Sequence, residues 1–529
     1  MLAFERVKKH FNTAGPCRAD WHYMVPPLPR VPEAPGLVEG GAYFVIHAPR
    51  QSGKTTFLRA FARELTAKGE LSAVYASCEA AEAMGEDVVA AQAVIVRRLE
   101  VEAEAQLPEE LRPAPFSTDT PETRFGDFLA HWSRGSRRKL VLLLDEVDAL
   151  RGQSLLAVLR QLRTAFPDRP EWAPWSVVLC GLRDVRDYKV ASGGDALRLG
   201  TSSPFNIEVE SLRIGDFDDE DVKDLLGQHE RETGQAFDEA ASARLMELAG
   251  GQPWLVNALA REVIDKMAVV GTITLEHVEQ AKERLVLARA THLDSLVSTL
   301  TDSRVRRVLE PIVAGEEPPF DAAFDDDVSY VLDLGLVKPR PLRVANPIYT
   351  EVIGRVLSDG IQRRVHADPR SFVRADGTLD LDVLVREFAA FWIEQGDVLV
   401  DGATYREAGA QLVLMAFLQR VVNGGGTVSR EYGAGRKRLD LLVAWPHLDA
   451  SGRRVVQREA IECKVWRDGK KDPLAEGLVQ LEGYLDRVGL ERGLLVLFDR
   501  RAGAGPIEQR TREEQAATAK GRPVRVLRA

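Results

Sequence analysis

Apolar runs alternate with segments of helical periodicity over the first two hundred residues. Each run is continuous in apolar residues, as in a strand buried on both faces, and each helical segment carries apolar residues three and four positions apart. The expected strands are 43–48, 73–78, 139–148 and 176–182, and the expected helices are 55–69, 86–100, 124–135 and 154–166. Strands and helices in this succession predict an α/β fold, with a parallel sheet covered by helices on both faces.

The pattern changes along the rest of the chain. From about residue 205 it predicts helices alone, as in a small helical lid, and residues 300–357 give two helices, two short strands and another helix, an order that resembles a winged helix. Long helices and then several strands follow, and the proline-rich start is expected to be an extended arm. We therefore expect five parts: an arm (1–36), an α/β core (37–204), a lid (205–292), a winged helix (293–365) and a C-terminal α/β domain (366–529).

Length and composition are those of a multidomain globular protein. The 529 residues exceed what one hydrophobic core holds, and no apolar run approaches the roughly 20 residues of a membrane span. The start lacks the apolar stretch of a signal peptide, and the four cysteines are isolated, with no metal-ligand spacing. These features favour a reduced, cytoplasmic setting and argue against a membrane as partner.

The net charge of −10 is unevenly distributed. Residues 421–529 hold 21 Lys and Arg against 15 Asp and Glu, which gives this segment a charge of +6 and the rest of the chain −16. A positive segment suits a phosphate backbone as partner, but its charge fits a solvated, arginine-rich surface equally well.

The segment between the first expected strand and helix has the residues of a phosphate-binding loop. Such a loop needs backbone N–H groups that point at phosphate, a lysine for the terminal phosphates and a hydroxyl for Mg²⁺. Lys54 and Thr55 stand at the required positions after a glycine, although Ala48 replaces the usual first glycine. The expected nucleotide contacts are Ala48, Gln51, Ser52, Gly53, Lys54, Thr55 and Thr56.

Two acids follow the apolar run LVLLL. At the carboxyl end of a strand, Asp145 can hold Mg²⁺ together with the hydroxyl of Thr55, and Glu146 can polarise a water molecule for attack on the γ-phosphate. The alternative is that both are ordinary solvated acids.

These two motifs, with CGLRDVRDYK after them and GGQPWLVNALA in the lid, resemble the AAA-like branch of P-loop ATPases, close to the archaeal ATPase and signal-transduction ATPase groups. The resemblance implies ATP and Mg²⁺ as cofactors, a polar sensor at or near Arg183, and Pro253 near the adenine. It also implies that the arm covers the base, with Tyr23 and Arg30 as candidates. Arg183 or Arg186 could act on a neighbouring subunit, and a simple salt bridge is the alternative for each.

A second group of candidate catalytic residues lies near the C-terminus. Metal-dependent cleavage of a phosphodiester needs carboxylates that converge on Mg²⁺ and a cation near the attacking hydroxide or the phosphate. Asp440 lies in the expected strand RLDLLVAW, and Glu462 and Lys464 lie in EAIECKVW. Because residues i and i+2 of a strand share a face, Glu462 and Lys464 point together, while Cys463 points away and can offer a metal only its backbone carbonyl.

This arrangement of Asp and then Glu-x-Lys resembles the PD-(D/E)xK nuclease superfamily over residues 400–500. The resemblance implies a mixed sheet flanked by helices, with these three residues as a catalytic centre for Mg²⁺ or Mn²⁺. Gln480 and Tyr484 extend the resemblance, since they match the Gln-x-x-x-Tyr motif of RecB-like members. Glu407 is either an additional metal ligand or an acid on a helix surface.

As a whole, the chain resembles bacterial AAA-like ATP-binding proteins fused to PD-(D/E)xK domains, for which defence against foreign DNA is an unspecific expectation. The leading hypothesis is an ATPase that regulates a metal-dependent endonuclease, with DNA as the expected partner. The alternative is a nucleotide-dependent scaffold or regulator that binds DNA without cleaving it. The sequence leaves open DNA versus RNA, the formation of a homo-oligomer, and the need for a trigger or a protein partner.

Overall fold

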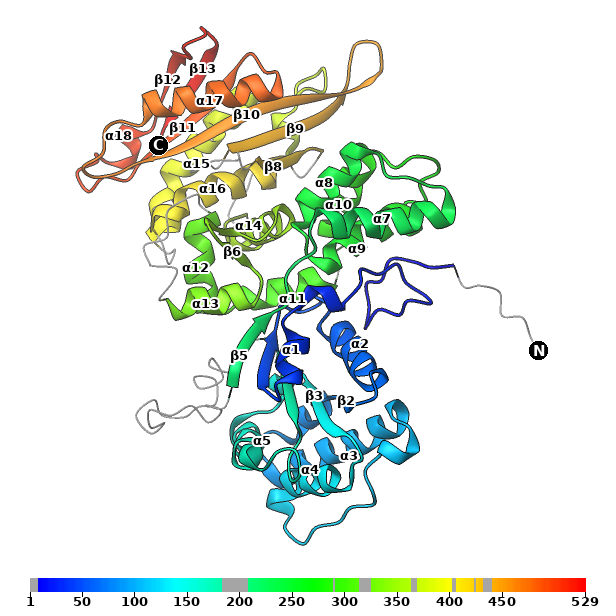
Figure 1. Cartoon of the computed structure of the whole chain (residues 1–529). Coiled ribbons are helices and arrows are strands. Elements are labelled where there is room, and N and C mark those ends of the chain that lie inside the picture. The colour runs from blue at the N-terminus through cyan, green and yellow to red at the C-terminus, as the bar shows by residue number, and fades with distance from the viewer. Residues whose placement is uncertain are drawn as a thin grey trace. The chain divides into compact units, whose positions relative to one another are not determined.

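The computed structural model describes residues 8–182, 208–288, 291–313, 325–362, 369–401, 406–422, 425–431 and 440–529 (Figure 1). The chain divides into two compact units, Met1–Ala290 with Tyr330–Leu336, and Thr291–Ser329 with Val337–Ala529. Within the described ranges, no helix combines the length and the apolarity that crossing a membrane requires.

A five-stranded parallel sheet forms the centre of the first unit. Its strands are β1 (Tyr43–His47), β2 (Leu71–Ser77), β3 (Lys139–Asp145), β4 (Ser176–Gly181) and β5 (Glu208–Arg213), in the spatial order β2-β3-β4-β1-β5. Every residue of β1 and β4 is buried, as expected of central strands in a sheet covered on both faces. The α/β class and the parallel sheet that the sequence predicts are confirmed.

Helices cover this sheet on both faces. In the part of this unit that the structure describes, two helices pack on one face and three on the other: α1 (Ala34–Glu39) and α2 (Lys54–Ala67), then α3 (Val88–Gln106), α4 (Arg124–Gly135) and α5 (Gly152–Ala165). The alternation of side chains along a strand divides β1 between the two layers. Phe44 and Ile46 join the core beneath α2, whereas Tyr43 and Val45 join the core beneath the three helices.

Strand β5 contradicts the expectation that helices alone follow residue 205. It pairs with β1 in parallel, with Ser211 opposite Val45, and forms one edge of the sheet. An edge strand keeps contact with water, and its sequence EVESLR therefore mixes charged and apolar residues. Because the segment has no apolar run, its periodicity could not reveal a strand.

In the described residues after β5, four α-helices occupy the segment for which we keep the name lid: α7 (Asp219–Thr233), α8 (Glu239–Ala249), α9 (Pro253–Arg261) and α10 (Leu275–Leu287). Aspartate side chains cap two of them, since Asp218 accepts a hydrogen bond from the backbone N–H of Asp221, and Asp238 accepts one from Ala241. The proline-rich arm before β1 is largely extended. It includes a 3₁₀ turn at Leu28–Arg30 and ends in α1, whose proline lies in the first turn, where proline is tolerated.

The second unit begins with helices and a short hairpin. The elements are α11 (Thr291–Thr299), α12 (Ser303–Val313), α13 (Asp326–Asp333), the antiparallel strands β6 (Val337–Pro339) and β7 (Leu342–Val344), and α14 (Pro347–Gln362). The division into units falls within α13, after Ser329.

A six-stranded mixed sheet forms the rest of the second unit, in the spatial order β12-β13-β11-β10-β9-β8. The strands are β8 (Thr427–Glu431), β9 (Asp440–Leu448), β10 (Arg454–Trp466), β11 (Gly493–Asp499), β12 (Arg512–Ala517) and β13 (Pro523–Arg528). The cores on its two faces contain α15 (Leu381–Asp401) and α16 (Arg406–Val422) on one side and α17 (Leu474–Val488) on the other, and the short α18 (Ile507–Arg510) lies between β11 and β12.

Gly251 allows the lid to approach the end of β5, and this approach leads to a stability prediction. Gly251 and Gly271 both have φ +81, so alanine at either position carries the strain of a left-handed conformation, roughly 1 kcal/mol. Only at Gly251 would the added Cβ meet backbone, with the Phe217 carbonyl oxygen at 2.2 Å, whereas Gly271 faces open space. We therefore expect Gly251→Ala to lower the free energy of unfolding by about 1–3 kcal/mol more than Gly271→Ala.

Calorimetric unfolding of the wild type and the two variants checks this expectation. Equal melting temperatures for Gly251→Ala and Gly271→Ala would show that the contact with Phe217 has no effect on stability.

Candidate functional site

The loop between β1 and α2 lies at the carboxyl edge of the parallel sheet. Gln51 (φ +59) and Gly53 (φ +94) have left-handed backbones, and α2 begins immediately after them, at Lys54. Left-handed residues in such a turn direct backbone N–H groups into a concavity that binds anions, and the first N–H groups of a helix add to it. Ser52 stabilises the turn, since its Oγ donates a hydrogen bond to the Pro49 carbonyl at 2.7 Å.

Lys54 lies across this loop. Its Nζ donates to the carbonyl oxygens of Ala48 at 2.8 Å and Pro49 at 2.9 Å. Ala48, which replaces the usual first glycine, is fully buried in the core beneath α2. A phosphate in the loop would give the ammonium group charged acceptors in place of neutral carbonyls, and such hydrogen bonds are the stronger ones.

Asp145 lies at the end of β3, next to the first turn of α2. It is only 1% exposed, and its Oδ2 accepts hydrogen bonds from Thr55 Oγ1 at 2.7 Å and from the Tyr75 hydroxyl at 3.3 Å. The two residues expected to hold Mg²⁺ are therefore in direct contact. One hydroxyl and one carboxylate suit this ion, which keeps several water molecules and takes its remaining ligands from phosphates.

Glu146 is held by a residue that the sequence analysis missed. Its carboxylate accepts a hydrogen bond from Ser77 Oγ at 3.0 Å, and its backbone is left-handed, with φ +54. Burial raises the pKa of Glu146, and the hydrogen bond from Ser77 opposes this rise. Ser77 ends β2, whose last residue pairs with Asp145 in register. A short polar residue at the end of a strand beside β3 was the signal that could have identified it.

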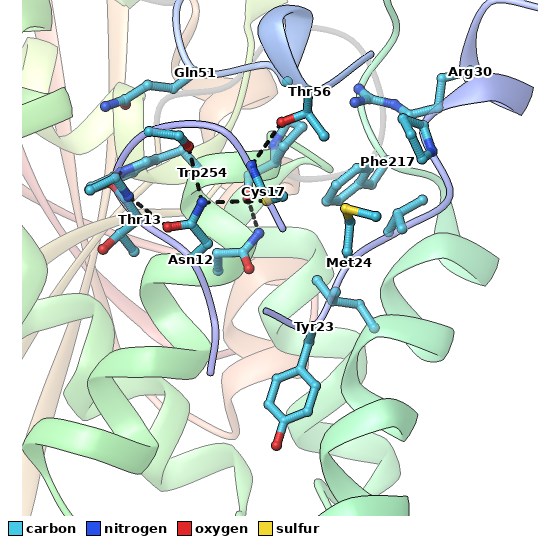
Figure 2. Close-up of a pocket in the computed structure, with 18 residues that line it drawn as sticks. Asn12, Thr13, Cys17, Tyr23, Met24, Arg30, Gln51, Thr56, Phe217 and Trp254 are labelled. Carbon is cyan, nitrogen blue, oxygen red and sulfur yellow. Dashed lines mark hydrogen bonds between the residues drawn. The ribbon is translucent and has the colours of Figure 1, made fainter. Parts of the chain in front are cut away.

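A pocket opens beside the loop, between the arm and the lid (Figure 2). Its lining combines aromatic and apolar side chains with a few polar groups, as in pockets that bind a flat organic group. The lining residues include Asn12, Cys17, Tyr23, Met24 and Arg30 of the arm, Gln51 and Gly53 of the loop, Thr56 in the first turn of α2, and Phe217, Pro253, Trp254 and Asn257 of the lid.

Asn257 supports the fit of a ligand to this pocket. Its Nδ2 donates to the Pro253 carbonyl at 2.8 Å, which fixes the orientation of the side-chain amide. Its buried Oδ1 has no hydrogen-bond partner in the described part of the chain. A ligand with a donor group would satisfy this acceptor, whose burial is otherwise unfavourable.

Hydrogen bonds attach the arm to the lid. Trp254 Nε1 donates to the Thr13 carbonyl at 3.0 Å. The side-chain amide of Gln228 exchanges two hydrogen bonds with the backbone of Met24, at 3.0 and 3.1 Å. The arm therefore forms one wall of the pocket in a defined position.

Two further contacts attach the arm to the loop. The backbone N–H of Cys17 donates to Thr56 Oγ1 at 3.0 Å. Arg30 Nη1 donates to the Ser52 carbonyl at 2.8 Å, while its guanidinium lies 4.9 Å from the ring centroid of Phe217. The arm is thus in contact with both the phosphate-binding loop and the lid.

The remaining candidates for the nucleotide site have different positions. Pro253 and Arg30 line the pocket, and so does Tyr23, although Figure 2 shows its ring directed away from Thr56 and Arg30. The Tyr23 hydroxyl lies 3.3 Å from Nδ1 of His229 in the lid. Arg183 and Arg186 lie outside the described residues.

In the second unit, β9 and β10 pair in antiparallel order with Asp440 directly opposite Glu462. Asp440 begins β9, and its side chain lies outside what the structure describes. Glu462 is 1% exposed, and its Oε1 lies 3.3 Å from Lys464 Nζ. Neither oxygen of Glu462 has a hydrogen-bond partner among the described residues. A buried carboxylate with open acceptor positions favours the binding of a cation.

Helix α17 completes the surroundings of Lys464. Gln480 and Tyr484 are buried, and Gln480 Nε2 donates to Glu476 Oε1 at 2.8 Å. Glu476 also lies 3.7 Å from Lys464 Nζ. Because residues four apart share a helix face, Glu476, Gln480 and Tyr484 all lie on the side of α17 toward β10. The sequence alone did not identify Glu476, an exposed acid in the first turn of α17.

The metal-binding roles expected of Cys463 and Glu407 stay predictions. Cys463 packs in the core on the opposite face of the sheet, with Ile461 and residues of α15 and α16. Glu407 lies in α16, and its side chain is outside the described set.

A comparison with known protein families identifies a domain in the first unit. The family model described as an AAA domain matches residues 38–188. No curated protein matches the chain.

Among solved structures, the chain is similar to the Walker-type ATPase PABY2304 of Pyrococcus abyssi, with 12% identity and a TM-score of 0.46 over 65% of this chain and 99% of that one. The RuvB Holliday junction branch migration motor of Thermotoga maritima gives 16% identity and a TM-score of 0.33 over 60% and 90%. Cdc6p from Pyrobaculum aerophilum gives 13% and 0.33 over 62% and 91%. From the AAA match and the loop geometry, we conclude that the first unit contains an AAA-type P-loop ATPase domain.

Proposed function

We propose that this protein is an ATPase whose nucleotide state regulates a Mg²⁺-dependent nuclease in the same chain, with DNA as the substrate. The observation that carries this proposal is the buried Glu462 carboxylate beside Lys464 and opposite Asp440, in a chain that also contains an AAA domain. A mixed sheet with α17 on one face and α15 and α16 on the other supports assigning residues 366–529 to the PD-(D/E)xK fold.

In the nucleotide site, the loop and the start of α2 would bind the phosphates of ATP, and the pocket would bind its base. Thr55 and Asp145 would hold Mg²⁺, which neutralises charge on the phosphates when it is bound. Lys54 would leave its two carbonyl acceptors for the terminal phosphates. Glu146 would orient the attacking water molecule, and Ser77 would set the position and protonation of its carboxylate.

In the nuclease site, Asp440 and Glu462 would hold Mg²⁺ or Mn²⁺, which polarises the phosphate and a water molecule when it is bound. Lys464 would then stabilise negative charge on the attacking oxygen or on the phosphate. Glu476 and Gln480 would keep the Lys464 ammonium group in place, because Glu476 contacts Lys464 and accepts a hydrogen bond from Gln480.

Regulation requires that ATP stabilise one state of the nuclease more than another. The arm contacts both the phosphate-binding loop and the lid, so nucleotide in the pocket would change how firmly these parts are held together. We assign residues 293–365 to a winged helix, based on the order of α12, α13, the β6–β7 hairpin and α14, and propose that it transmits this change.

Cleavage of a panel of single- and double-stranded DNA and RNA, with Mg²⁺ or Mn²⁺ and with or without ATP, tests the proposal. Lys464→Ala is expected to lower the cleavage rate by roughly 100-fold, because it removes a charge that stabilises the transition state. Lys471→Ala is the matched control, since it removes an exposed lysine from the segment before α17 and should leave cleavage unchanged.

Lys54→Ala connects the two activities in the same assay. It should abolish ATP hydrolysis and alter the rate of cleavage. If the wild type hydrolyses ATP but cleaves no substrate under any condition, the nuclease proposal is wrong, and a nucleotide-dependent regulator that binds DNA becomes the better account.

The hydrogen bond between Ser77 and Glu146 leads to a prediction about pH. Glu146 acts as a carboxylate, and the bond from Ser77 stabilises that form, which lowers the pKa of Glu146. Ser77→Ala should therefore raise this pKa further and move the acid limb of the ATPase pH profile to higher pH. Ser72→Ala is the control on the same strand, because the Ser72 hydroxyl is buried without a hydrogen-bond partner in the described residues. Identical profiles for wild type and Ser77→Ala would disprove the role of this bond.

A further inference from the structure

Strands β9 and β10 continue beyond the sheet as a two-stranded ribbon, here defined as residues 444–458. Strand β8 pairs with β9 only as far as Ala444, and β11 pairs with β10 only from Ile461 onward. Between these limits the two strands pair with each other, from Arg458 opposite Ala444 to Arg454 opposite Leu448. Figure 1 shows the ribbon and its turn projecting from the sheet.

One face of the ribbon is hydrogen-bonded to an earlier segment of the second unit. Trp445 Nε1 donates to the Gly377 carbonyl at 3.0 Å. The side-chain amide of Gln457 exchanges two hydrogen bonds with the backbone of Leu379, at 2.8 and 3.0 Å. These contacts hold the ribbon in place and leave its opposite face outward.

The opposite face carries Arg454, Val456 and Arg458, which alternate with the attached residues along β10. All three are exposed, and Val456 is 49% exposed. Their partners on β9 are uncharged: Leu448, Pro446 and Ala444.

The side chains of Arg454 and Arg458 have no ion pair or hydrogen bond to any described residue. The neighbouring Arg453 differs, because its Nε lies 3.4 Å from the Asp449 carboxylate. The ribbon holds three arginines and one aspartate, so the charge of its outward face is not neutralised. Two exposed guanidinium groups on an anchored ribbon leave positive charge available to an anionic partner.

The same face of β10 continues into the candidate nuclease site. One face of β10 carries four residues whose positions differ by even numbers: Arg454, Arg458, Glu462 and Lys464. At about 3.4 Å per residue, Arg458 lies roughly 13 Å from Arg454 and from Glu462 along β10. Helix α17 packs on this face from Ala460 onward, and the ribbon lies before that point.

We propose that Arg454 and Arg458 bind phosphates of the DNA whose phosphodiester bond lies at Glu462 and Lys464. One guanidinium group can donate two parallel hydrogen bonds to the oxygens of a phosphate. Its positive charge favours a polyanion over a neutral partner. The orientation toward the cleavage centre rests on the proposed function, whereas DNA binding by the ribbon does not.

Fluorescence anisotropy with labelled duplex and single-stranded DNA tests this inference on the full chain, without divalent ions so that no cleavage occurs. The variants are Arg454→Gln with Arg458→Gln, and Arg453→Gln as the control from the same ribbon. The double variant should weaken binding at least roughly tenfold and reduce the slope of log K against log salt by about 1.8 for duplex DNA, the value for two phosphate contacts. Arg453→Gln should keep the wild-type slope, and both proteins should retain wild-type ATP hydrolysis.

The outcomes separate this inference from the proposed function. A double variant that binds DNA with wild-type affinity and salt slope overturns the role of the ribbon, even if the wild type cleaves DNA. If the wild type never cleaves DNA and the double variant loses DNA binding, the result supports DNA binding by the ribbon and contradicts the proposed nuclease activity. A wild type that binds neither DNA form overturns both proposals.

Discussion

The parallel pairing of β3 with β4 and of β4 with β1 is the constraint on which the nucleotide site depends. Parallel strands end at the same edge of a sheet, so the loop after β1 and the acid after β3 are brought together although they are far apart in sequence. The hydrogen bond between Thr55 and Asp145 at 2.7 Å is the direct result. Ser77 reaches Glu146 for the same reason, because β2 lies next to β3.

A different rule organises the second unit. Along β10, alternate residues share a face, and this one face carries the outward arginines of the ribbon, then Ala460 beneath α17, then Glu462 and Lys464. The other face attaches the ribbon through Gln457 and continues into the core around Ile461. A single strand therefore combines residues of an anchored core, a buried carboxylate and two exposed arginines.

The sequence predicted the elements that have a strong local pattern. Strands β1 to β4 lie within a few residues of the predicted ranges, because their apolar runs are long and are bounded by polar turns. It failed for β5, an edge strand without an apolar run. It missed Ser77 and Glu476, since their roles depend on strand order and helix packing, which periodicity does not determine. The composition of the arm predicted an extended chain, but its hydrogen bonds with Gln228 and Trp254 depend on tertiary contacts alone.

We propose that one chain couples an ATP site to a DNA-cleaving site, and coupling between binding sites is reciprocal. The most direct test is the affinity for Mg²⁺–ATP measured by calorimetry with and without saturating DNA, in Lys464→Ala so that cleavage does not interfere. If the two sites are coupled, DNA should change this affinity by roughly 5- to 150-fold, the usual range for coupled sites. An unchanged affinity for ATP when DNA is bound would contradict this proposal.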